Sequence, residues 1–230
     1  MPKNTVFTLC LLAMCTFGLK AQGAPCYGTR FPQEGTIVAG VQSYSLLSRY
    51  LEDDFGKVRS LQHFLLISYG LTDWLSLDLK GGAGNIKQRP TTQSEIDYTS
   101  SFSGGYGFRV KLYEDENNLK AVCGFQHISV HPKKIHVNSD IHEAILDDWQ
   151  ASLLVSKDIG KVTPYLGVKW SRVDYIHKMN DVRKRRMSDL TKSLGGVLGL
   201  DIPFNEKTYL NLEAHFFDEQ AFSIALLYAI

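Results

Sequence analysis

Hydrophobic and polar residues alternate one by one along most of the chain. The pattern is clearest at residues 75–80, 105–112, 210–216 and 222–230, where apolar side chains recur at every second position. Successive side chains of a β-strand point to opposite faces, so this period of two predicts strands with one apolar face and one polar face.

Ten segments of this kind follow one another along the chain. We predict strands near residues 36–50, 59–71, 74–86, 98–114, 119–130, 147–157, 162–176, 192–203, 207–217 and 220–230. Tilted strands that cross a membrane need about 10 residues, whereas strands of soluble domains usually have about five or six. The lengths therefore favour membrane-crossing strands over a soluble periplasmic β-sandwich.

The connections between these strands alternate in length. Four of them are tight and turn-like, at Thr72-Asp73, 115–118, 158–161 and Asn205-Glu206, and the others are mostly long and charged. Bacterial barrels have short periplasmic turns and long outer loops. An even number of strands also lets the last strand pair with the first, which leaves no strand edge unpaired in lipid.

Aromatic residues gather near the tight turns. Tyr69 and Trp74 flank the first turn, Tyr165 follows the third, and Phe204 and Tyr209 bracket the fourth. Rings of this kind mark the membrane interface. The sequence thus predicts an all-β protein, a transmembrane antiparallel up-and-down β-barrel of about ten strands with both termini in the periplasm.

The N-terminal region has the pattern of an export signal. Lys3 precedes an apolar run over residues 6–19, and small residues follow at Ala21 and Gly23. The run is shorter than the roughly 20 residues of a membrane helix, so a cleaved signal peptide fits better. We expect a signal peptide at 1–23, a periplasmic N-terminal segment at 24–35 and a barrel at 36–230.

The strand-turn-strand unit Tyr69–Leu77 resembles those of small Gram-negative outer-membrane β-barrel proteins. The resemblance extends over the whole mature chain, and it implies an outer-membrane location, insertion by the barrel-insertion machinery and contact with outer-membrane lipids. The chain departs from that class at its last residue, where Ile230 replaces the usual terminal Phe or Trp.

The polar faces of the predicted strands carry charge. These positions, which would face the lumen, are Asp78, Lys80, Arg109, Lys111, Lys169, Asp201, Glu213 and His215. A barrel of about ten strands is too narrow for a wide channel, so we expect these groups to pair with one another inside it. A narrow ion-selective pore is the alternative.

Two cysteines remain after removal of the predicted signal peptide. Cys26 belongs to the N-terminal segment, and Cys123 lies near the periplasmic start of a predicted strand. An oxidising compartment permits a disulfide between them, and two buried thiols are the alternative.

One predicted outer loop is strongly basic, with Arg183, Lys184, Arg185 and Arg186 in succession. Arginine binds phosphate and acidic sugar groups in two-pronged contacts, so this loop is a candidate site for lipopolysaccharide or, in an adhesin, for anionic surface glycans. A solvated loop without a ligand is the alternative. We do not expect a nucleic-acid partner, because nothing in the sequence places this loop inside a cell.

The connection after residue 130 is rich in histidine, but the spacings fit no compact metal-ligand motif, and we predict no metal or cofactor. The segment Gln126–Ser129 resembles the His-x-Ser element of outer-membrane lipid A deacylases. That resemblance implies His127 as base, Ser129 as nucleophile and Glu143 as the carboxylate that orients the histidine. The chain has Val130 where that family has Asn.

We therefore expect a structural, surface-contact or narrow-pore barrel without catalysis. A lipid A deacylase-like esterase and an adhesin acting through the basic loop are the alternatives.

Overall fold

The structure is a computed structural model that describes residues 26–53, 55–91, 94–137 and 139–230. The signal peptide predicted for residues 1–23 lies outside the described residues. The elements are β1 (Ile37–Tyr50), β2 (Lys57–Thr72), β3 (Leu75–Arg89), β4 (Ile96–Glu114), β5 (Leu119–Val130), β6 (Ile135–Val137), β7 (Asp140–Lys157), β8 (Thr163–Met179), β9 (Val182–Met187), the 3₁₀ turn η1 (Leu190–Lys192), β10 (Leu194–Pro203), β11 (Thr208–Phe216) and β12 (Gln220–Ala229).

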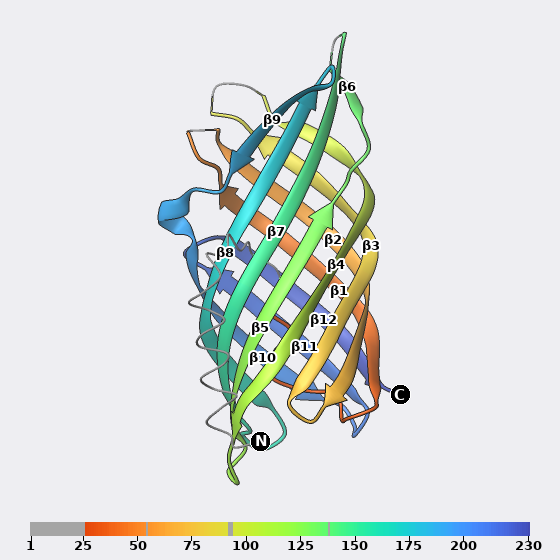
Figure 1. The fold of residues 1–230 in the computed structure, drawn as a ribbon, viewed down its shortest axis with the longest axis vertical. Helices are drawn as coiled ribbons and strands as arrows, with labels where there is room; N and C mark the ends of the chain where they lie inside the picture. The colour runs from red at the N-terminus through yellow and green to blue at the C-terminus, as the bar shows by residue number, and fades with distance from the viewer. Residues whose placement is uncertain (1–25, 54, 92–93, 138) are drawn as a thin grey trace.

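Ten of these strands form a closed antiparallel barrel (Figure 1). Around the wall the order is β1, β2, β3, β4, β5, β7, β8, β10, β11 and β12, and β12 pairs back with β1. In that closing pair Val38 lies opposite Ala229. The predicted up-and-down barrel of ten strands is confirmed.

The outer face of the wall is apolar. On β2, Leu65 is 68% exposed while its neighbour Leu66 is 1% exposed, and this alternation continues along the strand. Outward rows of leucine, isoleucine, valine and aromatic side chains recur on the other barrel strands. Water would not favour such a continuous apolar surface, whereas the hydrocarbon of a bilayer does. Among the described residues, no helix is long and apolar enough to cross a membrane.

The two ends of the barrel differ. Tight connections follow β2, β4, β7 and β10 at one end, here called the turn end, and both Ile37 and Ala229 lie there as well. The other end, here called the loop end, carries the segments 51–56, 90–95 and 180–193. The predicted alternation of short and long connections is confirmed for the first eight connections between wall strands, whereas the ninth, between β11 and β12, is also short.

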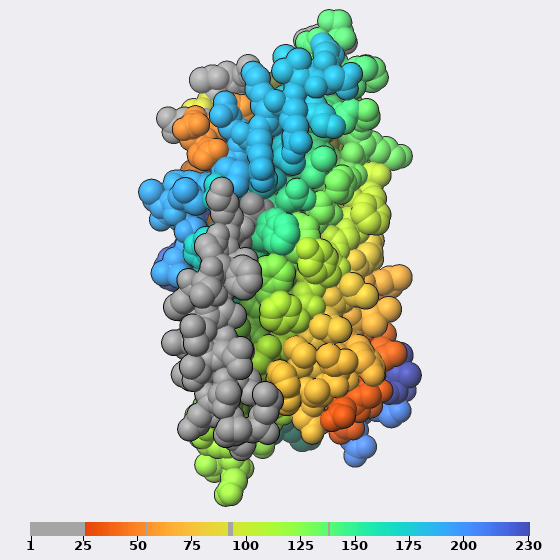
Figure 2. Space-filling model, in the orientation of Figure 1, coloured from red at the N-terminus to blue at the C-terminus, as the bar shows by residue number. Residues whose placement is uncertain are grey.

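β7 and β8 continue beyond the wall at the loop end, where the short strands β6 and β9 pair with them (Figure 1). In Figure 2 the light-blue surface of the β8–β9 extension rises above the wall of β3 to β5, drawn yellow to green. The predicted strand 147–157 begins at Asp140 instead, and the predicted strand 162–176 ends at Met179. Both strands are longer because β6 and β9 supply backbone partners outside the barrel.

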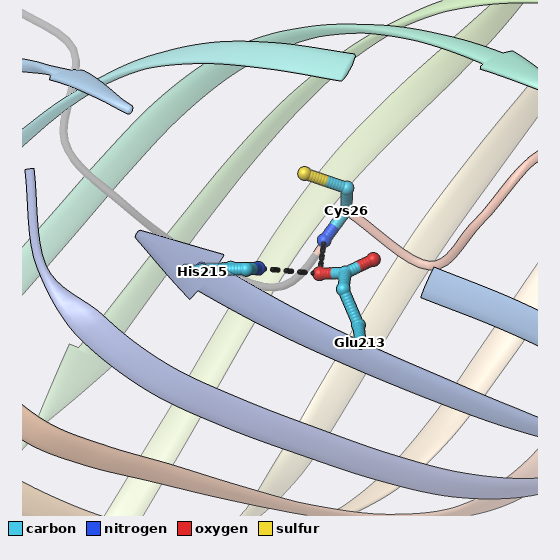
Figure 3. Close-up of side chains that lie close together, drawn as sticks. All are labelled: Cys26, Glu213 and His215. Atoms are coloured by element: carbon cyan, nitrogen blue, oxygen red, sulfur yellow. Dashed lines mark hydrogen bonds and ion pairs between the residues drawn. The ribbon is translucent and has the colours of Figure 1, made fainter. Parts of the chain in front are cut away.

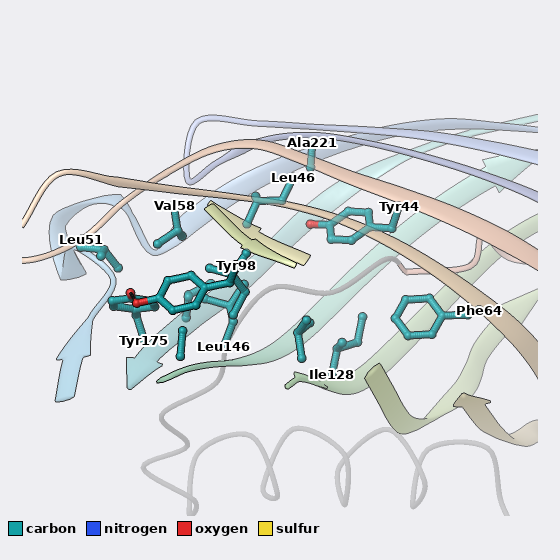
Figure 4. Packing of buried hydrophobic residues seen from close by; sticks show 14 residues of the cluster. Tyr44, Leu46, Leu51, Val58, Phe64, Tyr98, Ile128, Leu146, Tyr175 and Ala221 are labelled. Carbon is teal, nitrogen blue, oxygen red and sulfur yellow. Dashed lines mark hydrogen bonds between the residues drawn. The ribbon is translucent and has the colours of Figure 1, made fainter. Parts of the chain in front are cut away.

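The interior has an apolar half toward the loop end and a polar half toward the turn end. The apolar half is a cluster of buried residues that includes Tyr44, Leu46, Leu51, Val58, Phe64, Tyr98, Ile128, Leu146, Tyr175 and Ala221 (Figure 4). Most side chains of this cluster come from eight of the ten wall strands, all but β10 and β11, and they pack against one another inside the barrel as its apolar core.

Candidate functional site

The N-terminal segment lies inside the polar half of the barrel. Cys26, Tyr27 and Thr29 are each at most 2% exposed, and the Thr29 hydroxyl donates to Ser156 Oγ at 2.6 Å. Gly28 has φ of +68°, and a Cβ there would lie 2.9 Å from an Asp201 carboxylate oxygen. The segment therefore takes a backbone path that glycine permits and that a larger residue would obstruct.

Arg109 of β4 fastens this segment to the wall. Its guanidinium donates to the carbonyl oxygens of Tyr27 at 3.3 Å and Arg30 at 2.8 Å. The same guanidinium makes a two-pronged ion pair with Asp78 of β3, with both distances at 3.0 Å. The Lys80 ammonium lies over the Tyr27 ring, 4.2 Å from the ring centroid. Charged groups of the wall thus bind the main chain and the ring of the segment.

A second ion network crosses the middle of the interior. Arg49 Nη1 of β1 lies 2.8 Å from Asp218, and Lys169 of β8 lies 3.1 Å from the same carboxylate and also pairs with Glu219. Arg49 further donates to the backbone carbonyl of Ser171 at 3.0 Å. Each of the four charged side chains is at most 1% exposed, so each ion pair satisfies groups that would otherwise be buried unpaired.

His215 of β11 lies between two carboxylates of this network. Its Nε2 is 2.6 Å from Glu213, and its Nδ1 is 2.8 Å from Glu219. Figure 3 shows Glu213 and His215 projecting from the wall toward Cys26, whose backbone N–H donates to Glu213 at 2.7 Å. The Cys26 sulfur accepts a hydrogen bond from the Gln150 amide at 2.7 Å.

The Cys26 sulfur, one Glu213 oxygen and one His215 nitrogen lie within 4.8 Å of one another. These are three atom types that bind transition metals. Among the described residues they form a compact group of metal-ligand type inside the barrel.

The apolar cluster ends near the loop-end mouth with a pair of tyrosines. The Tyr175 hydroxyl lies 3.5 Å from the Tyr98 hydroxyl and donates to Gln88 at 3.2 Å. Beyond them is a pocket of about 570 Å³. There the ring nitrogens of His142 and His177 are 3.0 Å apart.

Seven of the eight side chains predicted for the lumen are buried in the interior, namely Asp78, Lys80, Arg109, Lys169, Asp201, Glu213 and His215. The eighth, Lys111, is partly exposed, lies close to the turn end and pairs with Glu114 at 2.6 Å. The structure also buries charged side chains that the sequence did not indicate: Arg49, Asp148, Asp218 and Glu219.

Of the two arrangements that the sequence leaves open for Cys26 and Cys123, the structure has the two buried thiols, and no disulfide joins them. Cys26 lies inside the barrel beside Gln150. Cys123 is on the other side of the wall, because it pairs in register with Leu153, an outward residue of β7. The backbone of β5 separates the two sulfurs.

The predicted deacylase residues lie on the outer face. His127 and Ser129 share the outward side of β5, where the His127 ring stacks on Trp149 with centroids 3.9 Å apart. The Ser129 hydroxyl lies 2.7 Å from His131 Nε2 and donates to Asp147. The nearest histidine partner of Ser129 is therefore His131.

Glu143 forms ion pairs with lysines and does not contact His127. It pairs with Lys134 and lies 3.6 Å from Lys178. The hydrogen bond from Lys134 to Glu143 also raises the pKa of Lys134. In the β5–β7 pairing His127 lies opposite Trp149, well along the strand from Glu143. The structure does not bring His127, Ser129 and Glu143 together as a triad.

The basic residues predicted for a loop belong to β9, so they alternate between two faces. Lys184 lines the loop-end pocket, and Arg186 lies 4.7 Å from the centroid of the Phe55 ring. Arg185 pairs with Asp174 on the outer face, and Arg183 shares that face. The four residues therefore form two pairs and not one basic patch.

The sequence and the fold of the chain are similar to those of known outer-membrane proteins. Residues 133–221 match the Chlamydia major outer membrane protein family. The matched stretch covers less than half of the chain, from the β5–β6 connection into β12. A search of curated proteins finds no match.

Many solved structures are similar to the chain, among them the following three. The transport unit of the autotransporter AIDA-I from Escherichia coli has 12% identity and a TM-score of 0.47, and the match covers 100% of this chain and 99% of that one. An outer membrane channel from Pseudomonas putida F1 has 10% identity and a TM-score of 0.46, and the match covers 94% of this chain and 100% of the channel. The translocator domain of the autotransporter NalP from Neisseria meningitidis has 9% identity and a TM-score of 0.42, and the match covers 98% of this chain and 96% of that domain.

Proposed function

We propose that this protein is an outer-membrane barrel whose lumen is closed and whose role is structural and surface-contacting. The observation that carries the proposal is the filled interior. From the turn end to the loop end, the barrel axis passes the N-terminal segment, the Arg49–Lys169 ion network and the apolar cluster around Leu146 and Tyr175.

The N-terminal segment, the ion network and the apolar cluster form three layers along the barrel axis, and each layer resists opening for a different reason. Pulling the N-terminal segment out would break the hydrogen bonds from Arg109 to its carbonyl oxygens. Separating Lys169 from Asp218 and Glu219 would leave charges buried without partners, which costs about 3–5 kcal/mol for a broken pair. Opening the apolar cluster would expose large apolar side chains to water. An open ion-conducting pore would have to disrupt all three layers.

The outward apolar rows support a membrane location, and the signal peptide expected at residues 1–23 supports export to the outer membrane. In this arrangement the turn end, where β1 begins and β12 ends, faces the periplasm, and the loop end faces the exterior. The apolar row Phe222, Ile224, Leu226 and Tyr228 on β12 would be the part that the barrel-insertion machinery recognises.

Surface contact is proposed for the β8–β9 extension. Arg183 and Lys178 lie opposite each other on its outward side, and Lys134 lies near them through their shared partner Glu143. Cations placed just beyond an apolar membrane belt favour phosphate and acidic sugar headgroups, as in lipopolysaccharide.

Two measurements test the proposal. Purified protein in planar bilayers is expected to give no steady conductance, and regular conductance steps would show an open pore and overturn the closed lumen. A tag at Asn180-Asp181, in the β8–β9 turn, is expected to bind antibody on intact cells. A matched tag in the 115–118 turn is expected to bind only after the outer membrane is permeabilised, and the reverse result would overturn the orientation.

A further inference from the structure

We propose that Cys26, Glu213 and His215 form a zinc site that fixes the N-terminal segment to the barrel wall. The three donor atoms lie within 4.8 Å of one another, and each residue is buried. A zinc ion binds cysteine sulfur at about 2.3 Å and nitrogen or oxygen at about 2.0–2.2 Å, so two ligand atoms of a tetrahedral zinc ion are about 3.3–3.7 Å apart. Binding would therefore move the Glu213 oxygen and His215 Nε2 apart from their present 2.6 Å and turn the Cys26 sulfur toward them.

The surroundings of His215 suit a metal ligand. His215 Nδ1 lies 2.8 Å from Glu219 and 3.0 Å from Lys169 Nζ, and its Nε2 lies 2.6 Å from Glu213. Two electron-rich atoms 2.6 Å apart repel unless a proton lies between them. When Nδ1 keeps its proton and donates it to Glu219, a zinc ion would replace the proton on Nε2, and Nε2 and the Glu213 oxygen would then move apart to more than about 3 Å. A carboxylate on the far nitrogen of a histidine is the usual second partner of a zinc ligand, because it orients the ring and raises its basicity.

The charges in the network leave room for a cation. Three carboxylates, from Glu213, Asp218 and Glu219, are linked to two permanent cations, Arg49 and Lys169. A second ring proton on His215 would balance them. A zinc ion would also balance them, because one of its two charges is matched by the Cys26 thiolate that forms when the thiol gives up its proton and binds the metal.

Asp148 is an independent sign of a missing cation. It is 1% exposed, and neither of its carboxylate oxygens has a hydrogen-bond partner. It lies on the same inward row of β7 as Gln150, whose amide contacts the Cys26 sulfur. A buried carboxylate without a partner is costly, and a cation in the same part of the interior would offset that cost.

The set of donor atoms selects the metal. Cysteine sulfur, histidine nitrogen and glutamate oxygen are the three ligand types of zinc in proteins, whereas calcium and magnesium take oxygen ligands. The site offers three protein ligands and so leaves the fourth tetrahedral position to a water molecule. Because Cys26 and β11 are far apart in sequence, the bound ion would close a long loop of the chain.

The site is tested by metal binding to the full mature chain, purified in detergent, stripped with a chelator and checked for folding by heat-modifiable gel mobility. We expect about one zinc ion per chain. With cobalt in place of zinc, a sulfur-to-cobalt charge-transfer band is expected in the near ultraviolet. Cys26→Ser should abolish the band, and the matched variant Cys123→Ser should keep it. Glu219→Gln should keep the band but weaken binding by about 10–100-fold, because Glu219 only orients the ligand.

Three results would overturn the proposal. They are a wild-type chain that binds no zinc, a cobalt adduct without a sulfur band, and a band that survives Cys26→Ser. A further variant, His142→Gln, addresses the histidine pair at the loop-end mouth. If it removes all bound metal while Cys26→Ser removes none, the metal belongs to that pair, and the interior site is rejected. Cys26 lies outside the strands, so its substitution leaves the barrel wall intact.

Discussion

Asp78 of β3 and Arg109 of β4 form a two-pronged ion pair inside the barrel, and the same arginine binds the main chain of the N-terminal segment. The pair therefore connects two wall strands to a piece of chain that belongs to neither. Since both side chains are buried, removal of one leaves the other as an unpaired charge.

Asp78→Ala is expected to lower the free energy of unfolding by about 3–5 kcal/mol, because it leaves the buried Arg109 guanidinium without its partner. Denaturant unfolding in detergent measures the change. Asp73→Ala, in the exposed turn after β2, is the matched control and should change stability by less than about 0.5 kcal/mol. Equal effects of the two variants would contradict the structure.

Arg109→Met is expected to loosen the N-terminal segment without opening the wall. Methionine fills similar space but cannot donate to the Tyr27 and Arg30 carbonyl oxygens. Trypsin should then cleave after Arg30 at least tenfold faster than in the wild type, while the barrel keeps its heat-modifiable mobility. Unchanged cleavage would mean that other contacts hold the segment.

Leu146 and Leu153, both on β7, should respond differently to truncation. Leu146 is fully buried in the apolar cluster, whereas Leu153 is 41% exposed on the outer face. Leu146→Ala is expected to cost about 2–5 kcal/mol, because it leaves a cavity. Leu153→Ala, in which detergent can fill the space, should cost less than about 1 kcal/mol. A larger loss for Leu153→Ala would mean that β7 faces the opposite way.

The double variant Lys178→Gln with Arg183→Gln should weaken binding of purified protein to lipopolysaccharide. Each basic residue near an anionic surface contributes about 1 kcal/mol, so we expect more than a tenfold loss of affinity. Lys184→Gln with Arg186→Gln removes the same charge from the inward face of β9. If this control loses as much affinity, net charge alone explains the binding.

Both cysteines should react with a maleimide when the unreduced protein is denatured, since Cys26 and Cys123 lie on opposite sides of the wall. Mass spectrometry counts the added groups. A protein that gains none before reduction and two after it would contain the disulfide that the structure excludes.

The alternating pattern was sufficient to predict the strands, because it depends only on which way neighbouring side chains point. It could not predict that Arg49 faces inward, since the β1 register shifts after Leu46 and reverses the alternation there. Nor could it predict β6 and β9, which are short and exist because β7 and β8 give them backbone partners.

The candidate site was less predictable than the wall. Glu213 and His215 are two positions apart on one strand, so the sequence placed both in the lumen. Their proximity to Cys26 arises from tertiary folding, because the N-terminal segment enters the barrel and meets β11. Asp218 and Glu219 were missed for a similar reason, since the short β11–β12 connection folds inward onto Arg49 and Lys169.

The pairing of β12 with β1 has a consequence for how the protein forms. Val38 meets Ala229, so the seam of the wall joins residues from opposite ends of the described chain. Contacts between such distant residues are slow to form. Until that seam closes, β1 and β12 each present an unpaired edge that can join another chain. The interval between synthesis and closure is therefore when this protein most needs a chaperone.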